Sequence, residues 1–363
     1  MSNSPVTIGL EITNYALSKV TTGIQNVISS FYNDLELYWR SRGIELVPTI
    51  CQKASNNDFK DVLASASLGG DFLKKKLVDP EDCQAIILPD IDNGIDFHRL
   101  KMLPSAREIP VIAFVYDILP LLHPEWMPTD GKRNFQIWLQ QTLYASSHLV
   151  ANSNKTRRDL NNLPWKINQK VSVVHLGSRL EPQIPKKFPN ELISVLYVST
   201  IEPRKGHDLL LEAFDLLRSW GCDVSVTFVG HKGWMIDELC NQIRNHPEFG
   251  SKLKWYEGGS DDVIRNLALE ANIGVMPSRG EGFGLFIEEG LSMGLKVIAS
   301  EIPEFLERAQ PNLFFSQLDG LALANSILQV HKTPWEDGFS PRTMRDFTFE
   351  LSQLIESIVL ESE

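Results

Sequence analysis

The sequence predicts an α/β protein of two domains, each built on a parallel sheet. Short apolar runs alternate with helical patterns from end to end, which is typical of parallel α/β sheets. The chain has 363 residues, more than one hydrophobic core usually supports. A break at residues 177–190, which carries three prolines and little that is apolar, reads as a linker. We therefore expect two similar domains with a cleft between them.

The first alternating series lies before the linker. Its strand candidates are short runs rich in valine, isoleucine and leucine, and its helices show apolar residues at helical spacing. The predicted helices are residues 23–40 and 135–147. The predicted strands are residues 6–12, 45–50, 85–89, 111–116, 149–153 and 171–176.

The second series follows the linker with the same alternation. Its predicted strands are residues 193–200, 224–229, 253–256, 273–276 and 296–300, and its predicted helices are residues 207–220, 234–245, 261–270 and 285–293. A last amphipathic helix covers residues 340–363. We expect residues 1–184 to form the first domain, completed by the helix at 341–363, and residues 190–340 to form the second. Capping of the second domain is the alternative for that helix.

Composition excludes several classes of protein. Hydrophobic residues make up 43% and charged residues 22% of the chain, as in ordinary globular proteins. The formal net charge of -11 argues against nucleic acid as a partner, because phosphate backbones bind to concentrated basic surfaces. The four cysteines form no CxxC pair and have no histidine at zinc spacing. We expect reduced thiols and no structural metal.

Membrane segments are not expected. The first residues lack the basic and apolar regions of a signal peptide, and no run reaches the roughly 18 apolar residues of a membrane helix. We therefore expect a cytoplasmic protein. Peripheral contact with the inner face of a membrane stays open, since residues 135–144 could form an amphipathic surface helix.

The most informative motif is the glycine-rich stretch at residues 279–290. In it a glycine-rich turn lies between Glu281 and Glu289, two carboxylates with seven residues between them, and the stretch joins an apolar strand-like run to a helical one. Glycines let a ligand approach the backbone, and a helix start offers free N–H groups and a positive dipole end. These features predict an anion site, and phosphate is the natural anion.

A second motif places two cations where another strand ends. Arg204 can bind an oxyanion bidentately and Lys205 adds a point charge. Both motifs fall at the carboxyl ends of strands in one domain, the edge where such folds bind ligands. Cations and glycine amides suit a diphosphate, while carboxylates suit sugar hydroxyls. A sugar nucleotide fits this set without a metal ion, and we expect the Asp261-Asp262 pair to be a helix cap.

These residues resemble a known family. The stretch 281–285 with Glu289, flanked by residues 277–278 and 294–300, looks like the carboxylate-bracketed motif of the family 4 retaining glycosyltransferases, also called group 1. The stretches 200–206, 230–234, 152–153 and 156–160 match the same family in order. The likeness is strongest over residues 193–304. It implies a GT-B fold, in which two Rossmann-like parallel-sheet domains face a central cleft.

The resemblance assigns roles to single positions. It places Glu281 by the donor sugar and Glu289 on the nucleotide ribose, while Arg204 and Lys205 neutralise the diphosphate leaving group. Backbone amides of the same loop would hold sugar hydroxyls and phosphate. These amides belong to Gly282, Phe283, Gly284, Leu285 and Phe286.

The first domain carries weaker likenesses. The stretch 21–24 resembles the family's glycine loop, so Gly23 would face the donor phosphate. The stretch 115–120 resembles its active-site segment, with Asp117 as the one catalytic carboxylate we nominate there. Many members carry histidine where this chain has Tyr116, and proline is frequent at the positions of Phe286 and Lys296. Because of the first departure, we do not expect the family's histidine-based role at this position.

The implied reaction moves a sugar, with retention of anomeric configuration, from a nucleoside diphosphate to a hydroxyl. GDP-mannose, UDP-glucose or its N-acetylated relatives, and dTDP-rhamnose all fit as donors. The acceptor would be a glycan, a lipid-linked glycan or another alcohol, and the subset of the family with Glu-Pro-Arg-Lys, which includes mannosyltransferase-like members, often makes bacterial surface polysaccharide. No cofactor is expected. The alternatives are a sugar-nucleotide epimerase of the same fold and a non-catalytic binding subunit.

Overall fold

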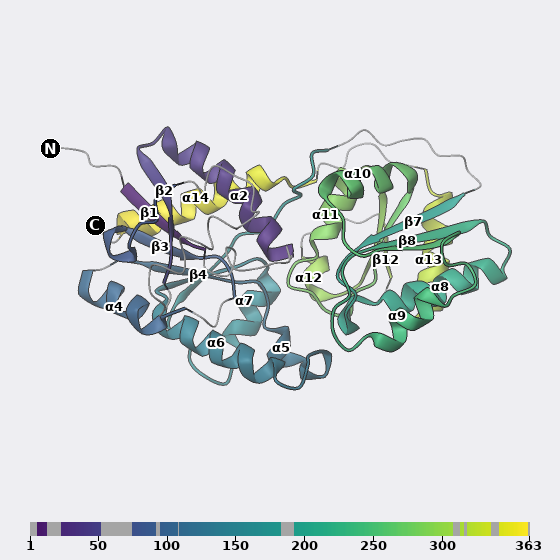
Figure 1. The fold of residues 1–363 in the computed structure, drawn as a ribbon, viewed down its shortest axis with the longest axis horizontal. Helices are drawn as coiled ribbons and strands as arrows, with labels where there is room; N and C mark the ends of the chain where they lie inside the picture. The colour runs from purple at the N-terminus through teal and green to yellow at the C-terminus, as the bar shows by residue number, and fades with distance from the viewer. Residues whose placement is uncertain are drawn as a thin grey trace.

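The molecule consists of two α/β halves, which lie side by side in a computed structural model (Figure 1). The structure describes residues 6–12, 23–51, 75–91, 95–107, 109–182, 192–307, 313–315, 318–334 and 341–361. The predicted class is confirmed, since each half contains one parallel six-stranded sheet with interleaved helices. Among the described helices, none is long and apolar enough to cross a bilayer.

The first sheet has the strand order β2-β1-β3-β4-β5-β6. Its strands are β1 (Val6–Glu11), β2 (Ile44–Thr49), β3 (Ala85–Leu88), β4 (Val111–Val115), β5 (His148–Ala151) and β6 (Lys170–Val173). All pairs are parallel, and every residue of β3 and β4 is buried. Continuous apolar runs are expected here, because helices cover both faces of a parallel sheet.

Helices of the first half pack on both faces of this sheet. They are α2 (Gly23–Arg40), α4 (Phe97–Arg107), α5 (Leu119–Leu122), α6 (Gly131–Ala145) and α7 (Asn154–Asn161), with short 3-10 turns η2 (Pro80–Asp82) and η3 (Pro124–Trp126). The predicted helix at 23–40 has the observed bounds. The helix α4 was not predicted, because Pro104 inside it argues against a helix.

The second sheet has the order β12-β11-β10-β7-β8-β9, so the chain runs outward from β7 in one direction and from β10 in the other. Its strands are β7 (Ile193–Val198), β8 (Val224–Val229), β9 (Leu253–Tyr256), β10 (Ile273–Met276), β11 (Lys296–Ser300) and β12 (Leu313–Phe315). Strand order reverses between β7 and β10, which pair directly. Ligands of open α/β sheets bind at such a switch point, outside the carboxyl ends of the strands.

Helices also cover both faces of the second sheet (Figure 1). They are α8 (His207–Ser219), α9 (Asp237–Arg244), α10 (Asp261–Glu270), α11 (Leu285–Ser292), α12 (Pro303–Leu306) and α13 (Gly320–Lys332), with the 3-10 turn η4 (Pro203–Lys205). The helix predicted from residue 234 begins three residues later, at Asp237. The backbone of Met235 is left-handed, with φ 57°, and this prevents an earlier start.

The C-terminal helix α14 (Met344–Glu361) returns to the first half. It lies against α2 (Figure 1), and its buried residues, such as Phe347 and Leu351, share a core with the first sheet. It therefore does not cap the second sheet. The chain crosses between the halves twice, and the crossings meet where Ser178 pairs with Thr343.

Candidate active site

The two predicted motifs meet at the switch point of the second sheet. Arg204 and Lys205 follow β7, and Glu281 follows β10. The loops are in close contact, because Gly206 has φ 70° and a Cβ there would lie 2.1 Å from the carbonyl oxygen of Pro277. Only glycine satisfies both the left-handed backbone and this approach.

Glu281 lies at the centre of this cluster. Lys205 Nζ donates to its Oε1 at 2.6 Å and its Oε2 at 2.8 Å, and Arg204 Nη1 donates to Oε2 at 2.6 Å. Ser278 Oγ donates to Oε1 at 2.9 Å. A carboxylate offers about four lone-pair sites, and these contacts fill them. Glu281 can therefore accept a ligand hydroxyl only after one of its present donors moves away.

The charges of the cluster reinforce one another. Burial would raise the pKa of Glu281, but Arg204 and Lys205 hold it at about 2. Burial would likewise lower the pKa of Arg204, but Glu281 and Glu202 raise it above its usual range. Glu281 and Arg204 are therefore both charged at neutral pH. Arg204 Nη2 makes no hydrogen bond to any described residue and remains available to an anion.

Two buried carboxylates that the sequence analysis did not single out support the cluster. Glu202 Oε1 forms an ion pair with Arg204, 2.8 Å from its Nε. Glu304 Oε1 accepts the backbone N–H of Glu281 at 2.5 Å. Glu202 lies in the stretch 200–206, two residues before Arg204, so its position in the sequence could have predicted that it supports the cations. Nothing in the sequence marks Glu304, because the contact joins segments 23 residues apart.

The start of α11 offers the predicted amides. Gly284 precedes the helix with φ 83°, and no hydrogen bond runs from the N–H groups of Gly284, Leu285 or Phe286 to the described part of the chain. Unpaired donors at a helix start favour an anion. The side chains of Phe283 and Phe286 are buried in the two cores, so these residues could offer only backbone to a ligand.

The first half contributes Asp117, which follows β4. A Cβ on Gly282 would lie 2.2 Å from the carbonyl oxygen of Tyr116 and 3.2 Å from Asp117 Cβ, so the loop that carries Glu281 touches the end of β4. Burial raises the pKa of Asp117, and Arg204 partly opposes this. The Tyr116 hydroxyl donates to the carbonyl of Pro89 at 2.9 Å, so it serves the core.

The glycine loop of the first half is seen only in part. Gly23 is the first residue of α2, while residues 21 and 22 lie outside the described residues. The predicted contact of Gly23 with donor phosphate stays a prediction.

A short helix connects the Glu281 loop to the first half. Glu304 of α12 holds the backbone of Glu281, as described above. Glu307, just after α12, accepts the N–H groups of Asn154 and Lys155 at 2.6 and 2.8 Å. Those N–H groups lie in the first turn of α7, where a negative charge is stabilising. The position of the first half is thereby coupled to the loop that carries Glu281.

Glu289, the second carboxylate of the glycine-rich motif, lies in α11 and is also buried. Its partner is Arg179, whose Nη2 lies 2.8 Å from Oε1. Arg179 also contacts Asp261 Oδ1 at 3.1 Å. The expectation that Asp261 caps a helix is wrong, because Ser260 is the N-cap and accepts from the N–H of Val263.

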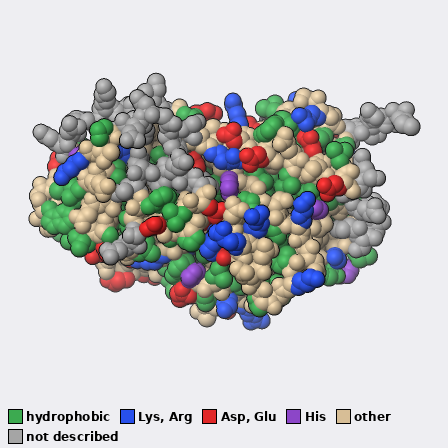
Figure 2. Space-filling model, turned by 180° about the vertical axis from the view of Figure 1, so that it is seen from behind, with side chains coloured by type: hydrophobic (Ala, Val, Ile, Leu, Met, Phe, Trp, Pro, Cys, Tyr) green, Lys and Arg blue, Asp and Glu red, His purple; other side chains and the backbone are tan. Residues whose placement is uncertain are grey.

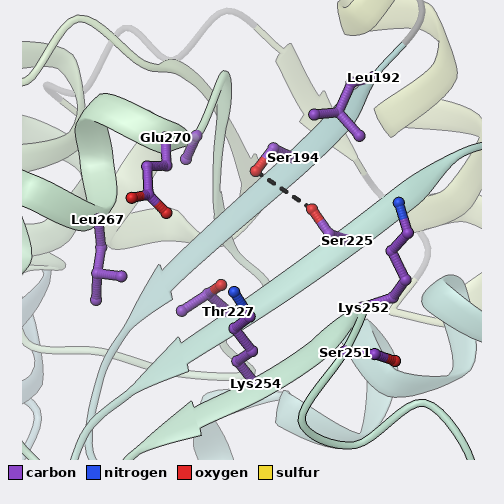
Figure 3. Close-up of a pocket in the computed structure, with 10 residues that line it drawn as sticks. Leu192, Ser194, Ser225, Thr227, Ser251, Lys252, Lys254, Leu267 and Glu270 are labelled. Atoms are coloured by element: carbon purple, nitrogen blue, oxygen red, sulfur yellow. Dashed lines mark hydrogen bonds between the residues drawn. The ribbon is translucent and has the colours of Figure 1, made fainter.

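A separate pocket of about 220 Å³ lies near the amino ends of β7, β8 and β9 (Figure 3). It is lined by hydroxyls and lysines, and Ser225 Oγ donates to Ser194 Oγ at 3.3 Å. This is the opposite edge from Glu281. On the face seen in Figure 2, basic and acidic side chains lie interspersed.

The family described as "Glycosyl transferases group 1" matches residues 193–333. The chain is 30% identical over 333 residues to "Serotype-specific mannosyltransferase WbdA" of Escherichia coli, which covers 84% of this chain and 40% of that protein. It is 28% identical over 240 residues to the E. coli "O-antigen chain mannosyltransferase B", covering 62% and 61%. The chain thus spans about two-fifths of the first relative.

Solved structures share the fold. Anabaena HepE, solved in complex with UDP and glucose, superposes with a TM-score of 0.62 over 98% of both chains, at 15% identity. The two facing parallel-sheet domains have the GT-B fold of these solved structures. Within that fold, residues 193–333 match the group 1 glycosyltransferase family.

Proposed function

We propose that this protein is a retaining glycosyltransferase that moves mannose from a nucleoside diphosphate to a hydroxyl of a growing glycan. The observation that carries the proposal is the buried cluster of Arg204, Lys205 and Glu281 beside the unpaired amides of α11. The choice of mannose and of a surface polysaccharide as acceptor follows the names of the two E. coli relatives. GDP-mannose is the first donor to test, ahead of UDP-glucose and dTDP-rhamnose.

Donor binding would exchange the partners of Glu281. The diphosphate takes hydrogen bonds from Arg204 and Lys205, which now saturate the carboxylate. Glu281 then has lone pairs for a hydroxyl of the donor sugar. A single ligand that carries both diphosphate and sugar makes both halves of this exchange, which neither a free sugar nor a nucleoside does.

The same cations would lower the barrier to transfer. Negative charge grows on the diphosphate as the glycosidic bond breaks, and fixed cations stabilise that charge without reorganisation. The acceptor hydroxyl attacks from the face of the leaving group, and the departing phosphate helps accept its proton. Burial raises the pKa of Asp117, and the nearby charge of Arg204 partly opposes this. Because two side chains already neutralise the diphosphate, we expect no metal requirement.

Transfer assays test the proposal. Purified protein is incubated with each of the three donors and a mannose-terminated acceptor, with and without EDTA. We expect transfer from GDP-mannose, unchanged by EDTA, with the α-linkage of the donor kept in the product. Arg204→Ala and Lys205→Ala should each lower kcat by about two to three orders of magnitude. Near wild-type turnover in both variants, or no binding of any nucleoside diphosphate, would overturn the assignment.

A further inference from the structure

Arg179 lies where the chain has left the first half and enters the segment before β7. Its side chain is only 8% exposed, although arginine normally stays at the surface. The neighbouring residue Ser178 pairs with Thr343 of the returning chain, which fixes the backbone here. Arg179 is thus held by the crossing between the halves, yet its guanidinium reaches into the second half.

The contacts of Arg179 are asymmetric on Glu289. Its Nε donates to Oε1 at 2.9 Å, and its Nη2 lies 2.8 Å from the same oxygen. Nη1 donates to the two oxygens of Asp261, at 3.1 and 3.4 Å. The second oxygen of Glu289, Oε2, makes no hydrogen bond to the residues that the structure describes. One oxygen is therefore anchored, and the other remains an open acceptor.

The ion pair of Arg179 and Glu289 is almost completely buried. The side chain of Glu289 is 5% exposed, and a carboxylate so buried is unfavourable unless a cation accompanies it. Asp261, 41% exposed, orients the guanidinium from the other side. A forked guanidinium can satisfy both carboxylates at once, which a lysine ammonium cannot do in the same geometry.

We infer that Arg179 is a positioning residue for nucleotide recognition: it anchors Oε1 of Glu289 and so presents Oε2 to a ribose hydroxyl of the donor. The inference rests on the proposed function, in which Glu289 binds the ribose. It adds that this contact depends on the segment joining the two halves. Ribose recognition and the crossing between the halves are then linked through one side chain.

Binding of GDP and of 2′,3′-dideoxy-GDP, measured by calorimetry, tests the inference. A hydrogen bond to a charged group is worth roughly 10- to 100-fold in affinity, so the wild type should prefer GDP by about that factor. In Arg179→Gln the preference should fall to less than about threefold, because Glu289 becomes protonated or turns away. Arg179→Lys should retain part of it, since the charge remains but the fork is lost.

Controls separate this role from a loss of folding. Arg265→Gln, in an exposed pair with Asp262 on the same α10, should leave the preference unchanged. Pyrophosphate affinity should stay near wild type in Arg179→Gln, which shows that the cation cluster is intact. If Arg179→Gln does not fold, Arg179→Lys carries the test. An undiminished preference in the Arg179 variants overturns this inference and leaves the proposed function standing. Absence of nucleotide binding by the wild type overturns both.

Discussion

Replacing Glu281 with glutamine removes the one negative charge that Arg204 and Lys205 share. These cations are 18% and 13% exposed, so little water can take the place of the carboxylate. The pKa of Glu281 is held at about 2 against an ordinary 4.5. That depression corresponds to about 3 kcal/mol of stability at neutral pH, lost as pH falls from about 4.5 towards 2.

We therefore expect Glu281→Gln to lose about 3 kcal/mol in urea unfolding at pH 7, which agrees with the roughly 3–5 kcal/mol cost of breaking a buried ion pair. The melting temperature should fall by roughly 6–12 °C, at about 2–4 °C per kcal/mol for a domain of this size. The matched control is Glu257→Gln, which breaks an exposed pair with Arg244 and should cost less than about 1 kcal/mol.

The same variant should bind the diphosphate more tightly while losing turnover. In the wild type, GDP competes with Glu281 for both cations, and in Glu281→Gln it does not. Recovery of about half of the lost 3 kcal/mol would tighten GDP binding by about tenfold. Calorimetry with GDP measures this directly. The partner-exchange argument is wrong if the variant is as stable as the Glu257→Gln control and binds GDP no better than the wild type.

Two further predictions concern steric fit and pH. Gly282→Ala places a methyl group 2.2 Å from the Tyr116 carbonyl oxygen, so kcat should fall by about 100-fold, the scale of a 1 Å displacement. Gly221→Ala meets nothing within 4 Å and strains only its own left-handed backbone, with φ 81°, so it should lower stability but leave kcat unchanged. Burial lowers the pKa of His207 from 6.5 to about 3. Between these two pH values the unfolded chain binds a proton on His207 that the folded protein does not bind. Urea unfolding should therefore show a contribution of about 2 kcal/mol lost between pH 7.5 and 5.0, and His207→Leu should abolish it; equal pH dependence in both proteins would contradict this reading.

Where the local sequence pattern is strong, it predicts the bounds of the helices and strands. The helix at 23–40 and the strands at 224–229, 253–256, 273–276 and 296–300 have the predicted bounds, because apolar periodicity and turn residues are local signals. Weak local signals failed: α4 contains a proline, and β12 is only three residues long. Packing against neighbouring elements stabilises both α4 and β12, and those neighbours cannot be identified from the local sequence.

For the candidate site, too, local sequence signals account for some features and tertiary contacts for the others. The sequence by itself determined that Arg204, Lys205 and Glu281 belong to strand ends in one α/β domain, since motif spacing and strand periodicity are properties of the chain. Only the tertiary structure decided that the cations bind Glu281 itself, that Glu304 holds its backbone, and that Arg179 occupies one oxygen of Glu289. These contacts join residues 23 to 110 positions apart. Their existence depends on where strand order reverses and where the chain crosses between its halves.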